Sequence, residues 1–255
     1  MIGYGKNGII TEGNKVLRDK KEIQVKDIII GDIHGCCGAY QEMVERLDPD
    51  PEQDRLVLLG DLFDRGPDSW EVFRAVQAHE KMFGDRFVLL RGNHEDYLLQ
   101  PHLTWGKRMM WNRVGREATV RSFKMHGERM ESAVPWLKEH CKMYWKGDGY
   151  QCAHAAVRTE PIEANDETTL LHDHELVMQN LYAGRLTVTG HIAIRQAAYF
   201  PGGGEDVQFL TEEDGAPLPE KGVICIDTGC GKGGRLTAMV IENGRYRLYS
   251  EPEYM

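Results

Sequence analysis

Three short apolar runs in the first hundred residues share one pattern. Residues 27–30, 56–59 and 87–90 read DIII, LVLL and FVLL, and a glycine follows each run within two residues. Continuous apolar runs of this length, bounded by glycine, are typical of strands buried on both faces of a sheet. Potential metal ligands come next, in GDIHG, GDLFDRG and RGNHE. The pattern predicts three strands whose carboxyl ends bring polar side chains to one place.

Segments with helical periodicity separate these runs. Within residues 39–47, apolar side chains recur at positions 40, 43, 44 and 47, and two prolines follow. A second helix is predicted over residues 69–83, with Asp68 as its N-cap. Because strands and helices alternate from residue 25 onward, we expect a βαβαβ arrangement with parallel, right-handed crossovers.

The second half of the chain has shorter apolar runs. We predict a hairpin over residues 142–155, which carries His154, and a strand over 186–189, which leads to His191. Further strands are expected at 223–227, 236–242 and 245–249, the last two joined by a tight turn at Asn243-Gly244. From the pattern alone, the fold class is mixed α/β with parallel and antiparallel parts.

Residues 96–140 differ in composition from the segments around them. Between residues 105 and 125, aromatic residues and methionines are interleaved with six lysines and arginines, which predicts that residues 96–140 form a helical cap and a wall of the substrate site. An amphipathic surface element with solvated arginines is the alternative. Residues 1–24 are predicted to be a loose lead-in, and residues 25–255 a single domain. The polar segment 158–173 is predicted to be a long loop, and residues 202–221 are predicted to be a surface excursion.

Charge and cysteine content narrow the possible functions. The 255 residues carry a formal charge of −9, with a pI near 5.6, which argues against a general nucleic-acid binder. The six cysteines form no CxxC pair, so we interpret them as reduced thiols. No apolar run is long enough for a signal peptide or a membrane span. We therefore expect a cytoplasmic protein that binds neither nucleic acid nor membrane.

The three motifs also identify a family. GDIHG, GDLFDRG and RGNHE, followed by CAHAAV, TGHIAI and IDTGCGKGGRL, resemble the phosphoprotein phosphatase branch of the calcineurin-like metallophosphoesterases. That branch includes serine/threonine protein phosphatases and bacterial diadenosine tetraphosphatases. The resemblance covers roughly residues 26–243. It implies two stacked mixed β-sheets flanked by helices, with a helical cap insertion.

The resemblance implies a centre with two divalent metal ions. Its ligands would be Asp32, His34, Asp61, Asn93, His154 and His191. Asp61 would bridge the two ions, and a hydroxide bridging them would attack phosphorus directly, with no phosphoenzyme. A set of oxygen and imidazole ligands without thiolate favours Mn²⁺, with Fe and Zn²⁺ as alternatives.

The same resemblance assigns the remaining catalytic roles. His94 would protonate the leaving oxygen, and Asp64 would orient its imidazole. Arg65 and Arg91 would bind the phosphate oxygens with their planar guanidinium groups. Glu95 belongs to the third motif, but we expect it to have a structural role.

Two departures from the family pattern concern the substrate. Bacterial members carry a further phosphate-binding arginine in a WxR-like stretch, and His174 stands where it is expected. Either this histidine binds substrate instead, or Arg158 or Arg185 replaces the arginine. The sequence His154-Ala155-Ala156 also differs from the HAG that the family prefers.

Taken together, the sequence predicts a phosphatase that hydrolyses phosphate monoesters, with serine/threonine protein phosphatase as the favoured activity. Symmetrical bis(5'-nucleosyl)-tetraphosphatase activity is the alternative, so the expected partner is a phosphoprotein or a dinucleoside polyphosphate. A metallo-nuclease fits less well with the acidic charge, and a catalytically inactive scaffold would have lost metal ligands. The spacing of the motifs does not encode the oligomeric state.

Overall fold

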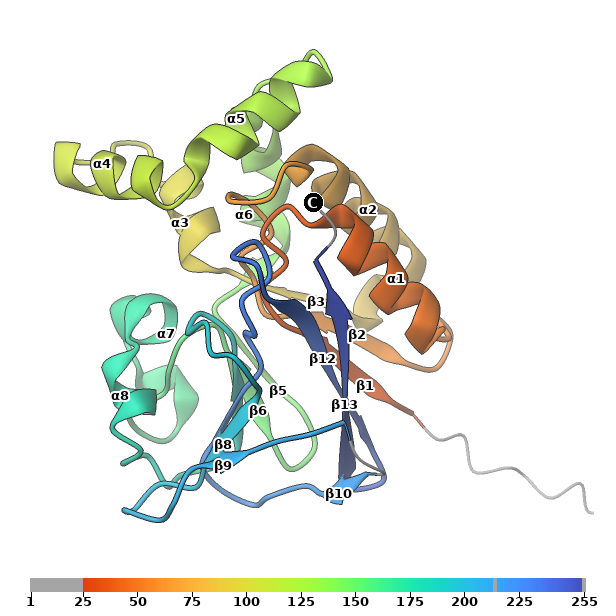
Figure 1. Ribbon diagram of the computed structural model, residues 1–255, viewed down its shortest axis with the longest axis vertical. Coiled ribbons are helices and arrows are strands. Elements are labelled where there is room, and N and C mark those ends of the chain that lie inside the picture. Colours follow the sequence, from red (N-terminus) through yellow and green to blue (C-terminus); the bar gives the residue numbers. More distant parts are fainter. Residues whose placement is uncertain (1–24, 213–214, 254–255) are drawn as a thin grey trace, which may run out of the picture.

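The computed structural model describes residues 25–212 and 215–253, which form two β-sheets packed face to face with helices outside them (Figure 1). This is the mixed α/β architecture that the sequence predicts. The predicted lead-in at residues 1–24 lies outside the described residues. Among the helices of the described ranges, none combines the length and the apolar character needed to cross a membrane.

The first sheet has seven strands in the order β10-β13-β12-β1-β2-β3-β4. Strands β1 to β4 are parallel, as predicted for the first three, and β12 pairs antiparallel with β1 and with β13. Its strands are β1 (Asp27–Ile30), β2 (Arg55–Leu58), β3 (Phe87–Leu90), β4 (Cys141–Lys142), β10 (Ala216–Pro217), β12 (Arg235–Glu242) and β13 (Arg245–Pro252).

The second sheet has six strands in the order β5-β6-β7-β11-β8-β9. The predicted hairpin at 142–155 is formed by β5 and β6, and the chain passes from the first sheet to the second just before it. The strands are β5 (Tyr144–Lys146), β6 (Gln151–Ala153), β7 (Thr187–Thr189), β8 (Ala198–Phe200), β9 (Gln208–Phe209) and β11 (Val223–Cys225).

Helices cover the outer face of each sheet (Figure 1). α1 and α2 lie against the seven-stranded sheet, while α7 and α8 lie beside the six-stranded one. The helices are α1 (Cys37–Leu47), α2 (Ser69–Phe83), α3 (Asn93–Leu99), α4 (Trp105–Arg113), α5 (Arg116–Met125), α6 (Val134–His140), α7 (Glu167–His172) and α8 (Glu175–Met178). Short 3₁₀ turns occupy Gly84–Arg86, Met130–Ala133 and Ile162–Ala164.

The apolar run of β1 shows why the first strands contain no polar alternation. Ile28 and Ile30 pack into the core beneath the helices, whereas Ile29 packs into the core between the two sheets. All three are essentially inaccessible to solvent. Because side chains of a strand alternate between faces, a strand with a core on each side must be apolar at every position.

Local predictions were met to different degrees. Asp68 is the N-cap residue of α2, as predicted, but its side chain makes no capping hydrogen bond; instead, the Trp70 backbone N–H donates to Ser122 Oγ at 2.9 Å. The prediction of a loop over 158–173 was wrong, because this segment contains α7. Asp166 is the N-cap of α7, and its carboxylate accepts from the Thr169 N–H at 2.7 Å. The excursion at 202–221 contributes the short edge strands β9 and β10.

Candidate metal centre

Seven polar side chains converge where strands of both sheets end. Asp32 and His34 follow β1, Asp61 follows β2, and Asn93 and His94 open α3 after β3. The second sheet adds two histidines from the loops that follow β6 and β7. These side chains, buried apart from a half-buried His191, are Asp32, His34, Asp61, Asn93, His94, His154 and His191. The structure thus brings together all six predicted metal ligands and the predicted general acid.

The backbone at this centre adopts unusual conformations. Among the eight non-glycine residues with positive φ in the described chain, five are predicted site residues. They are His34 (47°), Asp61 (50°), Asp64 (71°), Arg65 (68°) and His191 (64°). Left-handed backbone is unfavourable for residues with a Cβ, and it persists where surrounding contacts enforce it.

Glu95 supplies such contacts. Its carboxylate accepts hydrogen bonds from the backbone N–H groups of Asp61 at 2.7 Å, Leu62 at 2.9 Å and Gly92 at 3.0 Å. The side chain therefore ties the second motif to the third. Burial raises the pKa of Glu95 to about 7, and the nearby Asp61 carboxylate adds to the shift.

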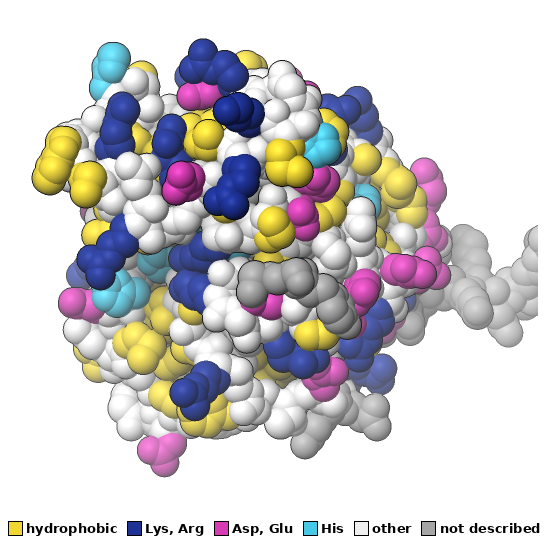
Figure 2. All heavy atoms as spheres, turned by 45° about the horizontal axis from the view of Figure 1, so that its top comes forward, with side chains coloured by type: hydrophobic (Ala, Val, Ile, Leu, Met, Phe, Trp, Pro, Cys, Tyr) yellow, Lys and Arg dark blue, Asp and Glu magenta, His cyan; other side chains and the backbone are white. Residues whose placement is uncertain are grey.

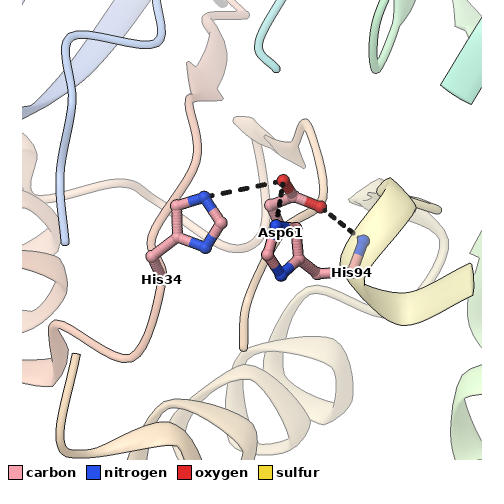
Figure 3. Close-up of side chains that lie close together, drawn as sticks. All are labelled: His34, Asp61 and His94. Atoms are coloured by element: carbon pink, nitrogen blue, oxygen red, sulfur yellow. Dashed lines mark hydrogen bonds and ion pairs between the residues drawn. The ribbon is translucent and has the colours of Figure 1, made fainter. Parts of the chain in front are cut away.

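Asp61 lies at the middle of the cluster. Its Oδ2 is 3.5 Å from Nε2 of His34 and 3.8 Å from Nε2 of His94, and its Oδ1 accepts from the His94 backbone N–H at 3.0 Å (Figure 3). One ligand atom from each of these three residues lies within 4.8 Å of the others. On the same side, Asp32 Oδ2 is 3.9 Å from Nε2 of His34.

A second group forms around the other oxygen of Asp61. Nε2 of His154 lies 3.5 Å from Asp61 Oδ1 and 3.0 Å from Asn93 Oδ1. Nδ1 of His191 is 2.8 Å from the same Asn93 oxygen. Each oxygen of Asp61 thus faces a different set of imidazoles, which is the arrangement needed for a carboxylate that bridges two ions.

Hydrogen bonds fix the tautomers of two of these imidazoles. Nδ1 of His34 donates to the carbonyl of Phe63 at 2.8 Å, and Nδ1 of His154 donates to the carbonyl of Leu59 at 2.9 Å. A carbonyl can only accept, so Nε2 of each ring keeps its lone pair. Burial lowers the pKa of both histidines, and that of His191 falls to about 3 for the same reason. Neutral rings with free lone pairs are the form that binds metal.

The surroundings of the Asp32 carboxylate indicate whether metal ions fit this centre. Its Oδ1 is buried and has no hydrogen-bond partner among the described residues. Oδ2 of Asp227, which lies nearby, is also buried and also has no such partner. Burial, together with the charges of Asp227 and Asp61, raises the pKa of Asp32 well above its usual value. Buried acceptors without donors are costly. A divalent cation would satisfy them, so the donor set fits the two ions that the sequence implies.

The predicted general acid His94 is rigidly held. Its Nδ1 lies 2.6 Å from Asp64 Oδ2, while its Nε2 faces the cluster. Asp64 also accepts from Trp111 Nε1 at 2.6 Å and from Thr119 Oγ1 at 2.7 Å. Burial opposes protonation of His94, but the Asp61 and Asp64 carboxylates outweigh it and raise its pKa. The sequence analysis did not identify Trp111 and Thr119 as site residues. No motif near either residue indicates that it contacts Asp64, which is about fifty residues away in the chain.

The two predicted phosphate-binding arginines have different environments. The Arg65 guanidinium contacts Nε2 of His34 and lies 3.4 Å from Nε2 of His94, so it points into the cluster. Arg91 pairs with Asp96, whose carboxylate also accepts from the Gln100 amide. The position of the Arg91 guanidinium is therefore fixed by a carboxylate to which the sequence analysis assigned no role.

His174, predicted to bind substrate, is not brought to the centre. It is exposed at the start of α8, and its side chain has no hydrogen bond or ion pair with any residue that the structure describes. His172, at the end of α7, lies there instead, with Nε2 3.8 Å from Asp96 Oδ2. The offset of two residues arises because the sequence analysis predicted a loop at 158–173, where the structure has α7.

Neither proposed replacement for the missing arginine reaches the centre. Arg158 pairs with Asp173 at 2.9 Å, and Arg185 donates to the carbonyl of Gly147 at 2.8 Å.

The change from HAG to HAA has a simpler outcome. The methyl group of Ala156 is fully buried in a small apolar cluster with Val177 and Phe200, so the structure accommodates it.

A glycine beside Asp32 gives a test of the centre. A Cβ at Gly190 would overlap Asp32 Oδ1, the partnerless oxygen. We expect Gly190→Ala to displace this carboxylate and to weaken Mn²⁺ binding by about 10–100-fold, measured as the shift of the thermal unfolding midpoint against Mn²⁺ concentration. Gly106→Ala in α4, where a Cβ meets nothing within 4 Å, is the matched control. Equal Mn²⁺ affinity in both variants would contradict a role for Asp32.

Comparisons with known proteins bear on this geometry. The model of the calcineurin-like phosphoesterase family matches residues 28–215. A protein of Aromatoleum aromaticum named symmetrical bis(5'-nucleosyl)-tetraphosphatase is 28% identical over 266 aligned residues, covering 85% of this chain and 93% of that one.

Two solved structures share the fold. One, of a protein proposed to be a diadenosine tetraphosphatase, is 20% identical, with a TM-score of 0.59 and coverage of 90% of this chain and 94% of that one. The other is a protein serine/threonine phosphatase from Saccharomyces cerevisiae with similarity to human phosphatase PP5. It is 14% identical, with a TM-score of 0.59 and coverage of 92% and 82%. At such low identity the two structures bear on the fold alone.

Proposed function

Since the chain belongs to the calcineurin-like phosphoesterase family and is a metal-dependent phosphoester hydrolase, we propose that its substrate is a dinucleoside tetraphosphate, cleaved symmetrically. The observation that carries the proposal is the relative named for this activity, which aligns over most of both chains. The sequence favoured a serine/threonine protein phosphatase. The comparison supports the alternative better, because the phosphatase of Saccharomyces cerevisiae resembles this chain in fold only.

The metal ions would be held by the two groups around Asp61. Asp32, His34 and Asp61 would hold one ion, and Asp61 would share the other with Asn93, His154 and His191. We propose Mn²⁺ for both positions because the ligands are oxygen and imidazole. Bound ions would activate water for attack at neutral pH and neutralise phosphate charge.

The side chains of the protein perform the remaining steps. Arg65 points into the cluster, where its guanidinium binds oxygens of the attacked phosphate and offsets the charge that develops in the transition state. Arg91, fixed by Asp96, binds a neighbouring phosphate oxygen. His94 gives the proton on its Nε2 to the leaving oxygen, while Asp64 keeps the proton on Nδ1 and stabilises the cationic ring.

Symmetrical cleavage breaks one P–O bond at the central bridge of the tetraphosphate. Water adds its oxygen to one of the two central phosphorus atoms, and the bond from that phosphorus to the central bridging oxygen breaks. The bridging oxygen leaves with one nucleoside diphosphate and takes the proton from His94. The attacking water releases one proton to solvent, and His94 regains one from solvent. The second nucleoside diphosphate keeps the oxygen of the water, so the products are two identical molecules when both nucleosides are the same.

Product analysis tests the proposal. Protein stripped with EDTA should be inactive, and added Mn²⁺ should restore hydrolysis of diadenosine tetraphosphate to ADP as the sole product, measured by chromatography. Release of ATP with AMP would contradict symmetrical cleavage. If the protein releases phosphate from a phosphoserine peptide and leaves the dinucleotide intact, the proposal is wrong, and serine/threonine protein phosphatase becomes the better supported activity.

A further inference from the structure

A cavity of about 330 Å³ lies between α3, α4 and α7. Its lining includes Tyr97, Gln100, Lys107, Glu167, Thr168 and His172. In the space-filling view, Lys, Arg and His side chains gather around a recess on the left of the face shown (Figure 2). The volume is at the lower end of the range for small-molecule sites, which suits one nucleoside rather than a whole dinucleotide.

The cavity adjoins the general acid. The ring of Tyr97 meets the ring of His94 edge to face, with centroids 6.1 Å apart. His172, which also lines the cavity, has its Nε2 3.8 Å from Oδ2 of Asp96, and the carboxylate of Asp96 pairs with the predicted phosphate-binding Arg91. A leaving group protonated by His94 would therefore lie at the mouth of this cavity.

The walls offer aromatic surface. One face of the Tyr97 ring stacks on Trp111, with a centroid distance of 5.8 Å and an interplanar angle of 22°. Tyr97 lines the cavity and Trp111 does not, so the cavity meets the part of the ring that Trp111 leaves uncovered. The ring of His172 is tilted by 54° at 6.5 Å from Tyr97. An uncovered aromatic face beside a second ring is suited to stacking a base.

The charges of the lining also favour a nucleoside over a phosphate group. Asp96 and Glu167 contribute carboxylates, and Lys107 is the one lysine or arginine among the described lining residues. Asp96 is already bound by Arg91 and Gln100. Glu167, at the exposed start of α7, is free to accept from ribose hydroxyl groups. Lys107, whose Nζ contacts Gln100 Oε1 at 3.2 Å, can reach a phosphate at the entrance.

From these contacts we infer that the cavity binds the nucleoside of the leaving nucleotide, with Tyr97 as its stacking platform. The inference rests on the proposed function and adds the residues that would distinguish a dinucleotide from a simple phosphate ester.

Steady-state kinetics on diadenosine tetraphosphate test the inference. Tyr97→Leu removes the aromatic face, so the KM should rise about tenfold with kcat within about twofold of wild type, because stacking is lost equally from the ground and transition states. The ratio of kcat/KM for the dinucleotide to that for p-nitrophenyl phosphate should fall by a similar factor. Since Tyr97 also packs on Trp111, a second change is made at the surface, where Glu167→Gln should raise the KM about threefold.

The control is His174→Asn, two residues beyond His172, which should leave both constants unchanged. If wild-type protein cleaves the dinucleotide and Tyr97→Leu and Glu167→Gln keep its KM, the cavity is not the nucleoside site, although the proposed function stands. If wild-type protein hydrolyses p-nitrophenyl phosphate but makes no ADP from the dinucleotide, the proposed function fails, and this inference fails with it.

Discussion

Replacing Asp61 with asparagine should abolish both turnover and metal binding. Each oxygen of Asp61 lies 3.5 Å from Nε2 of a different histidine, so this carboxylate belongs to both halves of the centre. Asparagine keeps the shape but loses the charge, and its NH₂ group would point a donor at a position that should hold a cation. We expect kcat to fall by about 10³-fold or more, because the charge stabilisation supplied by the metals would be lost.

Thermal unfolding separates this effect from misfolding. Mn²⁺ at 100 times its Kd should stabilise the wild-type protein by about 2.7 kcal/mol, whereas the Asp61→Asn variant should show little or no shift. The metal-free variant should unfold near the wild-type temperature, since the substitution is isosteric and also removes a charge beside the buried Glu95. The matched control is Asp206→Asn, which neutralises an exposed carboxylate. Two ions counted by mass spectrometry in the Asp61→Asn variant would refute the bridging role.

The strands that carry the first ligands could be predicted because their signal is local. Residues 28–30, 56–59 and 87–90 are apolar at every position, and a glycine and then the ligands follow each run within a few residues. Sheet membership could not be predicted, because pairing between strands depends on contacts distant in sequence. Thus the hairpin at 142–155 was expected, but its place in the second sheet, beside β7, was not.

At the site, the six predicted ligands meet, yet their supporting contacts were invisible in the sequence. Asp64 is held by Trp111 and Thr119, about fifty residues away in the chain, and no periodicity encodes such a contact. The mistake over His174 had a detectable cause. Asp166 three residues before Thr169 is a helix-start signal, and recognising it would have placed His172 at the end of a helix.

The exchange of His94 for asparagine should slow hydrolysis while both ions remain bound. A ligand atom of His94 lies within 4.8 Å of ligand atoms of His34 and Asp61, so distance alone would also allow His94 to be a metal ligand. Its short contact with Asp64 favours the role of proton donor, because the pair fixes one ring nitrogen and directs the other toward the leaving oxygen. Two ions per chain in the variant are the expected count, and the loss of one ion would make His94 a ligand.

The size of the kinetic effect should depend on the leaving group. A serine alkoxide needs a proton to depart, so hydrolysis of a phosphoserine peptide, if wild-type protein catalyses it, should slow by about 10²–10⁴-fold. The leaving group of the dinucleotide is a nucleoside diphosphate, whose terminal phosphate has a pKa of about 6, so protonation matters less and the loss should be much smaller. The measurement is kcat/KM for a series of aryl phosphates with leaving phenols of different pKa. The kcat/KM of the variant should fall more steeply with increasing phenol pKa than that of wild type. Asp64→Asn should show the same trend with a smaller slope, because it leaves the imidazole in place but unsupported. An equal loss for every leaving group would instead mean that His94 acts on the attacking side.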